Sequence, residues 1–473
     1  MSENAQNGAA QAAVSVKHPF LAMFGMLIGG FVGMLSETSL NIALPNLMTQ
    51  LHVSVGTVQW LVTGYMLVIG IVLPLSSLLT KWFSTRSLII FALCDFIVGA
   101  AISALAPSFT ILLIGRMIQG IATGLILPLM FTVATLIYPP YKLGSAMGMI
   151  GLVIMFAPAI GPTLAGIVLG VLSWEWIFWL FIPFLLVALF FAIRYLPNVA
   201  KLTKPKIDIL SILLSTVGFG GLVVAVSMST DYGWGSANVL VTLIVALIVL
   251  FFYIRRQLHS DAPILNFHVY NRPQFRIGSI LVMLDFGIIL SSMYLLPMFW
   301  QNGLAIAVAL TGVVMLPGGV VNAVVSAFSG RLYDNGGAKK PAILGFLIVI
   351  IGLAMLFFTT KNSAIWYVIL AHIVIMVGAP LAMSPTQTYG LNALDQQTAG
   401  DGSTIMNTFQ QIIGAVSTAV ATSLLGLGQA ASTAANTSRT AFTNGVHYGL
   451  LFPLALAVIA FVVSFTIKDK KTD

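Results

Sequence analysis

Fourteen apolar runs follow one another along this chain of 473 residues, and each is long enough to cross a lipid bilayer. A membrane-spanning helix needs ~20 mostly apolar residues. Only 7% of the residues are charged, whereas a soluble domain is roughly 25% charged. The sequence therefore predicts an all-α integral membrane protein. The approximate limits of the expected spans are 19–42, 57–80, 87–105, 109–137, 143–172, 175–195, 209–229, 237–254, 275–300, 305–330, 341–360, 364–390, 402–427 and 446–467.

The basic residues are distributed unevenly between the loops. With the N-terminus inside the cell, 18 of the 21 Lys and Arg residues fall in inside segments. Lys361 and Arg439 fall outside, and Arg116 alone lies within a span. The positive-inside rule describes this asymmetry. The net charge of +8 therefore reflects topology, with both termini cytoplasmic, and no nucleic-acid surface is expected.

Two longer inside connections, at 196–208 and 255–274, divide the spans into six, two and six. The short basic loops at 76–86 and 330–340 occupy equivalent places in the two halves. Repeated halves are typical of secondary transporters, whose sites lie between the repeats. No GxxxxGK[ST] run is present, so ATP is not the expected energy source. The predicted domains are a disordered cytoplasmic tail (1–18), an N-terminal six-helix half (19–195), a linker with two additional spans (196–274), a C-terminal six-helix half (275–467) and a cytoplasmic tail (468–473).

Four short motifs occur in the spans where one transporter family carries them. They are "LSETSLNIALP" at 35–45, "GRMIQG" at 115–120, "APAIGPTLAG" at 157–166 and "GRLYDNGGAKK" at 330–340. Through them the chain resembles the major facilitator superfamily, specifically its fourteen-span drug:proton antiporters of the EmrB/QacA type. It departs from that pattern in carrying Glu37 in place of Asp, and Ser77 and Thr80 in place of the Gly and Asp of the first-half loop.

The resemblance implies the major facilitator fold, with two six-helix halves plus two extra helices, in the cell membrane. It also implies proton-coupled export of hydrophobic or cationic compounds by alternating access. The expected partners are small substrates, protons and membrane lipid. No cofactor and no metal is expected, and the need for an accessory fusion protein is left open.

Glu37 is a carboxylate within the first apolar run. A charge in hydrocarbon costs ~3 kcal/mol even on lenient scales, so it needs a function or a partner. At 1.5 Å per residue, Glu37 lies ~9 Å and Arg116 ~10 Å below the same membrane face. We expect the two to form a pair that holds Glu37 ionised until a proton or a cationic substrate competes for it. The alternative is a static ion pair.

Three further ionisable residues lie within spans. Asp285, near the middle of the ninth span, is expected to face Glu37 across the cavity as a second proton site or cation anchor, or else to cap a neighbouring helix. Asp95, in a span that the family fold makes peripheral, is expected to form a structural hydrogen bond. His372 is able to titrate, but its apolar flanks favour a structural role. Participation of Asp95 or His372 in coupling is left open.

A group of polar and aromatic side chains within the spans is expected to line the substrate cavity. Aromatic walls with few fixed donors bind amphipathic molecules with little selectivity. The alternative for each member is a hydrogen bond between helices. The group comprises Asn41, Trp60, Tyr65, Gln119, Asn407 and Gln411.

Two motifs are expected to control opening. In the fifth span, small residues at a spacing of four allow close helix contact and prolines permit bending. The resemblance places this motif, Pro158, Gly161, Pro162 and Gly166, at the interface between the halves. The loop motif resembles a cytoplasmic latch, in which Asp334 accepts hydrogen bonds and Gly337 allows a tight turn. The latch comprises Gly330, Arg331, Asp334, Gly337 and Lys339.

Other functions are weighed against drug export. A lipid or glycolipid translocase, or an exporter of one native metabolite, is the main alternative, since fourteen-span relatives share these motifs. A receptor or scaffold would not need repeated halves. An enzyme is not expected, because no His, Asp or Glu cluster has metal-ligand spacing and no nucleophile lies beside a plausible base.

Overall fold

The computed structural model describes residues 18–138, 140–199, 202, 208–260, 263–432 and 438–468. Thirteen helices in this part of the chain are long and apolar enough to cross a membrane, and α5 adds a shorter apolar stretch, Phe156–Val171. The helices are α1 (Pro19–Gln50), α2 (Val55–Trp82), α3 (Thr85–Ala104), α4 (Phe109–Ile137), α5 (Pro140–Val171), α6 (Glu175–Tyr195), α7 (Ile209–Tyr232), α8 (Ala237–Leu258), η1 (Phe267–Asn271), α9 (Pro273–Met298), η2 (Phe299–Gly303), α10 (Val308–Gly336), α11 (Lys339–Phe357), α12 (Ile365–Leu391), α13 (Gln396–Ala430) and α14 (Ser438–Ser464).

Several helices begin at a side chain that satisfies their first free amide groups. The hydroxyl of Ser54 accepts from the N–H of Thr57 at the start of α2, and that of Ser84 accepts from Ser87 at the start of α3. Asp208 caps α7 in the same way. Such caps supply hydrogen bonds that the first turn of a helix lacks. Short polar loops therefore suffice to separate long apolar helices.

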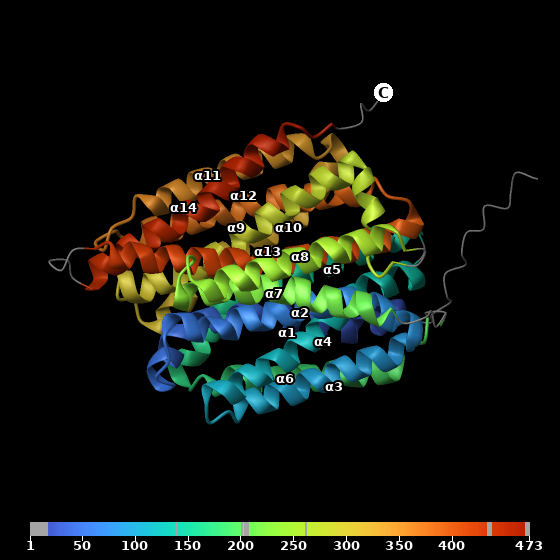
Figure 1. The fold of residues 1–473 in the computed structure, drawn as a ribbon, viewed down its shortest axis with the longest axis horizontal. Coiled ribbons are helices and arrows are strands. Elements are labelled where there is room, and N and C mark those ends of the chain that lie inside the picture. Colours follow the sequence, from blue (N-terminus) through green and yellow to red (C-terminus); the bar gives the residue numbers. More distant parts are fainter. Residues whose placement is uncertain are drawn as a thin grey trace, which may run out of the picture.

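The helices form two bundles that lie side by side (Figure 1). Helices α1–α6 pack together in one bundle, and α9–α14 pack together in the other. The bundles meet along two seams, where α5 packs on α10 and α2 packs on α13. Helices α1 and α9 also contact each other between these seams. The start of α1 and the end of α14 lie at the same end of the molecule (Figure 1).

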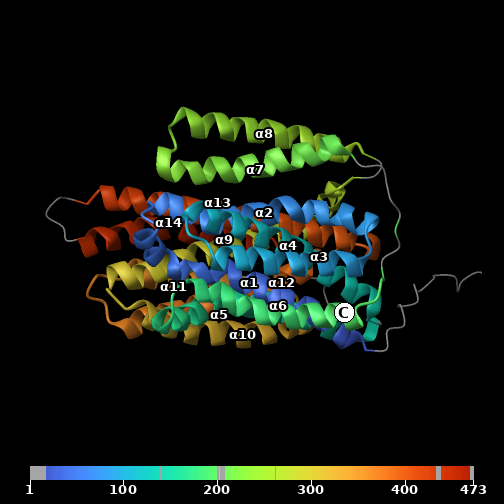
Figure 2. The same ribbon diagram turned by 90° about the horizontal axis from the view of Figure 1, so that it is seen from below.

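Helices α7 and α8 form a hairpin outside the two bundles, beside α2 and α13 (Figure 2). The ring centroids of Phe219 on α7 and Phe409 on α13 lie 5.8 Å apart, edge to face. Further along, the hydroxyls of Ser229 and Ser423 lie 3.2 Å apart. The hairpin therefore covers the seam between α2 and α13 and leaves the seam between α5 and α10 uncovered (Figure 2).

Two glycines lie against each other where α5 packs on α10. A Cβ atom added to Gly166 would lie 2.6 Å from the Cα of Gly312, and one added to Gly312 would lie 2.9 Å from the Cα of Gly166. The two backbones are thus in direct contact, as small residues permit in membrane helices. Gly166 belongs to the predicted interface motif, and it does lie between the bundles.

The connection from α10 to α11 turns at Gly337, whose φ is +77° and whose N–H donates to the carbonyl of Tyr333 at 2.9 Å. This left-handed conformation favours glycine. Gly330 lies within α10, and Lys339 begins α11. The side chains of Arg331 and Asp334 lie outside the described residues, so the latch interactions stay a prediction.

The hairpin supplies a test at acid pH. Hydrogen bonds from Arg256, at 3.0 Å to both carboxylate oxygens, lower the pKa of Asp208 from 3.8 to about 2. Because folding lowers this pKa, the ionised carboxylate stabilises the fold above about pH 4, and the effect disappears as the pH falls toward 2. We expect Asp208→Asn to lower the thermal midpoint in detergent at neutral pH, and the difference from the parent to shrink below about pH 4. A difference that persisted unchanged to pH 2 would contradict this.

The glycine contact supplies a second test. We expect Gly166→Ala to force α5 and α10 apart and to destabilise the protein by about 1–3 kcal/mol. Gly426 on α13 is the matched control, since a Cβ there would meet nothing within 4 Å. Thermal unfolding of both variants in detergent is the measurement. Equal midpoints for the two variants would show that the seam tolerates the added methyl group.

Candidate functional site

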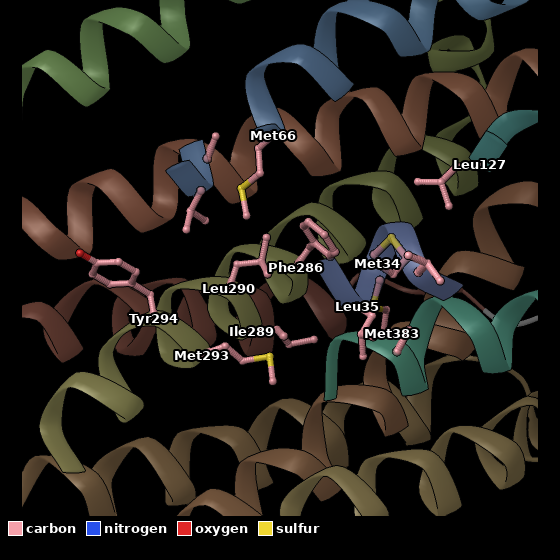
Figure 3. Close-up of a cluster of buried hydrophobic side chains, with 14 of the residues drawn as sticks. Met34, Leu35, Met66, Leu127, Phe286, Ile289, Leu290, Met293, Tyr294 and Met383 are labelled. Atoms are coloured by element: carbon pink, nitrogen blue, oxygen red, sulfur yellow. The ribbon is translucent and has the colours of Figure 1, made fainter. Parts of the chain in front are cut away.

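A cavity lies between the two bundles, enclosed by α1, α5, α9, α10 and α12. It has about 430 Å³ of empty volume, of which about 30 Å³ can hold the centre of a water molecule. Glu37 is the one carboxylate in the lining and Asn322 the one amide. Figure 3 shows much of the apolar wall. The lining residues are Met34, Glu37, Ile154, Pro158, Phe286, Ile289, Leu290, Met293, Asn322, Met376 and Met383.

Helix α1 presents three consecutive polar residues to three different surroundings. Ser36 faces the N-terminal bundle, where it accepts a hydrogen bond from Arg116. Glu37 faces the cavity. The hydroxyl of Thr38 donates to the carbonyl of Pro158 on α5 at 2.9 Å. A helix turns about 100° per residue, so the rotation of α1 decides which of the three faces the cavity.

Glu37 is fully buried, and neither of its carboxylate oxygens has a hydrogen-bond partner among the described residues. The amide of Gln411 on α13 and the guanidinium of Arg116 act on it electrostatically without reaching hydrogen-bond geometry. An ionised carboxylate in such a place is costly unless it is paired. A proton or a cation that enters the cavity would supply the missing partner.

Arg116 on α4 is held by hydrogen bonds from three helices. Its Nη1 donates to the hydroxyl of Ser36 at 2.5 Å and to Oε1 of Gln119 at 3.1 Å. Its Nε donates to the carbonyl of Leu61 at 3.1 Å. The guanidinium carbon lies 4.0 Å from the centroid of the Tyr65 ring, a cation–π distance. Arg116 therefore joins α1, α2 and α4 inside the N-terminal bundle.

The structure corrects the expectation that Glu37 and Arg116 form an ion pair. The two side chains are electrostatic neighbours, but they form no ion pair among the described residues. Matching depth was the basis of the expectation, and depth does not fix rotation about the helix axis. Ser36, one residue earlier, occupies the face of α1 that meets Arg116. Their shared role in proton coupling stays a prediction.

Asp285 on α9 is fully buried, and its two carboxylate oxygens lack partners among the described residues. Its neighbour Phe286 lines the cavity, but Asp285 does not. The structure thus places Asp285 on α9 next to a lining residue, and the expectation that it faces Glu37 across the cavity stays a prediction. A part in coupling stays a prediction.

The six residues predicted to line the cavity have other surroundings. Tyr65 and Gln119 belong to the Arg116 network, and Asn41 donates across the bundle interface to the carbonyl of Met293 at 3.4 Å. Trp60 is half-buried on α2. Asn407 lies 3.5 Å from the hydroxyl of Ser403 within α13, and Gln411 lies near Glu37. None of the six contributes to the lining. Their contact with a substrate stays a prediction.

The sequence reasoning missed the methionine wall. Met34 lies three residues before Glu37 and thus on the same face of α1. On α9, Phe286, Leu290 and Met293 follow helical spacing, and on α12 Met376 and Met383 are seven apart. This spacing was the available signal. Methionine is flexible and polarisable, so such a wall adapts to different apolar shapes.

The fifth-span motif connects both bundles. The carbonyl of Pro158 accepts from Thr38, and Gly161 packs directly against Leu35 and Thr38 of α1. On the other side, the carbonyl of Pro162 lies against Gly312 of α10. The motif therefore packs where the two bundles move if the cavity opens. Its gating role stays a prediction.

The remaining titratable residues do not assemble into a metal site. Asp95 on α3 is half-buried, and its Oδ2 has no partner among the described residues. His372 on α12 is buried beside the ring of Trp300. Among the described residues, no group of three or more His, Cys, Asp and Glu side chains is placed to hold a metal ion.

Comparison with known proteins adds sequence and fold relationships. Residues 26–418 match the sequence profile of the Major Facilitator Superfamily. The lincomycin resistance protein LmrB of Listeria innocua is 46% identical over 459 residues, which cover 96% of this chain and 97% of that protein. The protein of the same name in Bacillus subtilis is 47% identical over 460 residues, covering 95% and 96%.

A solved structure shares the fold. The crystal structure of a POT family transporter in complex with a thioalcohol-conjugated peptide has a TM-score of 0.71 and 14% sequence identity, covering 97% of this chain and 99% of that one. At this level of identity the likeness concerns the arrangement of helices alone.

The Arg116 network supplies a test. Lys carries one ammonium group in place of a planar fork, so it is unable to reproduce the contacts with Ser36, Gln119 and Leu61 together. We expect Arg116→Lys to destabilise the protein by about 1–3 kcal/mol in detergent. The control is Arg194→Lys, which changes an exposed residue of α6. Equal thermal midpoints for the two variants would show that the network contributes little.

Proposed function

The chain belongs to the Major Facilitator Superfamily, and from that premise we propose that it is a multidrug exporter of the fourteen-span EmrB/QacA type, driven by proton entry. The family and the candidate spans make it a multi-pass membrane transporter rather than an enzyme. The proposal adds fourteen spans, cytoplasmic termini, location in the cell membrane, and exchange of protons for hydrophobic or cationic compounds.

Glu37 is the observation that carries this proposal. It is a fully buried carboxylate with no hydrogen-bond partner in the part of the chain that the structure describes, and the cavity is otherwise apolar except for Asn322. A charge is retained at such a place where it has a function. A proton and a cationic substrate would both neutralise Glu37, and both would occupy the same carboxylate. The two ligands would thus compete, and competition at one site is the simplest basis of exchange.

Arg116 would assist this exchange from within the N-terminal bundle, outside the cavity lining. Its positive field acts on Glu37, yet its own hydrogen bonds go to Ser36, Gln119 and Leu61. Release of the proton from Glu37 therefore leaves a carboxylate that a nearby cation stabilises without neutralising by contact. One charge that crosses a potential of 100 mV yields ~2.3 kcal/mol, which is enough to bias the release.

Alternating access would use the two seams. The cavity takes its lining from both bundles, so rotation of one bundle against the other changes the end at which it opens. The contact between Gly166 and Gly312 is smooth enough to permit such movement. The loop between α10 and α11 would hold one end closed until the seam there separates.

Lincomycin is the first substrate to test, because the two relatives that cover nearly the whole chain are named for resistance to it. The methionine wall supports a wider range of amphipathic compounds, since flexible side chains repack around different shapes. One carboxylate in the lining favours compounds with a single positive charge.

Glu37→Gln tests the centre of the proposal. Everted membrane vesicles with a fluorescent probe of the proton gradient would receive lincomycin or a lipophilic cation. We expect the parent to dissipate the gradient and Glu37→Gln to lose at least about tenfold of that rate, because the amide exchanges no proton. Asp95→Asn is the matched control, a change from carboxylate to amide in α3, away from the cavity, and it should behave as the parent does.

Two results would count against the proposal. If Glu37→Gln matched the parent, Glu37 would be a structural residue. If no compound disturbed the gradient in the parent, proton-coupled drug export would give way to translocation of a lipid or of one native metabolite.

A further inference from the structure

A second unpartnered polar residue lies close to the cavity but outside its lining. His372 on α12 is 1% exposed, and both of its ring nitrogens lack a hydrogen-bond partner among the described residues. The ring of Trp300 meets it edge to face, with centroids 5.8 Å apart. The indole Nε1 of Trp300 is also buried and finds no partner within the described part of the chain. Two polar groups thus share one enclosed place without satisfying each other.

A histidine with a structural role in this fold has different surroundings. His447 on α14 lies 2.7 Å, through its Nε2, from the carbonyl of Thr359. A buried polar group normally has such a partner, because leaving it without one costs about 1–3 kcal/mol. His372 has none, so packing alone does not account for an imidazole at this position.

The backbone of α10 is shaped to admit the His372 ring. A Cβ atom on Gly318 would overlap that ring, so only glycine lets the imidazole lie against this helix. The ring is therefore held between α10 and η2 rather than turned toward lipid. A precise position for a titratable ring is what proton transfer requires.

The cavity lining begins one helical turn beyond His372. One turn further along the two facing helices lie Asn322 on α10 and Met376 on α12, and both line the cavity. Nδ2 of Asn322 lies 3.4 Å from the sulfur of Met376, so the two helices touch at this level. Four residues correspond to a rise of about 6 Å along a helix. His372 is therefore one helical step from the cavity that contains Glu37.

We propose that His372 is a proton-relay residue, which passes protons between Glu37 and the end of the membrane domain where α12 begins, through water held in the cavity beside Asn322. This inference rests on the proposed function. One ring nitrogen accepts a proton while the other releases one, and the released proton passes through water to a Glu37 carboxylate oxygen, which becomes a carboxylic acid. The region open to water centres, about 30 Å³, is large enough for a water molecule.

The experiment separates proton movement from substrate exchange. Purified protein in liposomes would be assayed for proton flux driven by lincomycin or tetraphenylphosphonium, with a pH-sensitive dye inside. The same liposomes would be assayed for exchange of the labelled compound without a gradient, which needs no net proton movement. We expect His372→Gln to slow proton flux by roughly tenfold or more while exchange stays within about twofold of the parent.

Two further variants complete the design. His447→Gln removes an imidazole that already has a partner, and it should leave both activities near those of the parent. Gly318→Ala keeps the imidazole of His372 but displaces it, and it should reproduce the selective loss of proton flux. It also decides the case if His372→Gln folds poorly and loses both activities.

The outcomes distinguish the relay from the proposed function. If the parent shows no proton flux with either compound, the proposed function fails. If the parent shows flux and His372→Gln or a well-folded Gly318→Ala retains it, the relay is overturned while proton-coupled export stands. Equal loss of flux and exchange in Gly318→Ala would assign His372 a structural role instead.

Discussion

Hydrocarbon offers no hydrogen bonds, and this constraint decides both the helices and the few polar side chains between them. Each backbone group within a span must find its partner inside the chain, which leaves long helices joined by short capped turns. The same constraint acts on Arg116. Its contacts with Ser36, Leu61 and Tyr65 run from α4 to α1 and α2, and its contact with Gln119 lies within α4. Together with the hydrogen bonds of the Tyr65 hydroxyl with Gly33 and Thr123, these contacts connect α1, α2 and α4.

Glu37 shows the opposite condition on the same helix. Its neighbour Ser36 belongs to the satisfied network, whereas Glu37 faces the space between the bundles without a partner. His372 is unpartnered in the other bundle, one helical turn from the same space. Arg116 and its neighbours in the N-terminal bundle are thus bound to one another, whereas Glu37 and His372 have no hydrogen-bond partner among the described residues. The second condition suits a transporter, whose ligands arrive and leave.

The positions of the helices could be predicted from the sequence, because an apolar run of membrane length identifies a span without tertiary information. The expected span at 209–229, for example, corresponds to α7 at Ile209–Tyr232. Rotation about each helix axis could not be predicted in the same way. In a membrane both lipid and protein neighbours are apolar, so hydropathy does not mark the buried face. For this reason Ser36 rather than Glu37 meets Arg116, and methionine and other apolar side chains make up most of the cavity lining.

The hairpin of α7 and α8 makes the two lateral sides of the molecule unequal. It covers the seam between α2 and α13 and leaves the seam between α5 and α10 uncovered (Figure 2). The cavity draws its lining from α5 and α10 and none from α2 or α13. Of these two seams, only the one between α5 and α10 consists of helices that line the cavity. For a compound that entered through that seam, partition into the membrane rather than aqueous concentration would set the concentration that the protein meets.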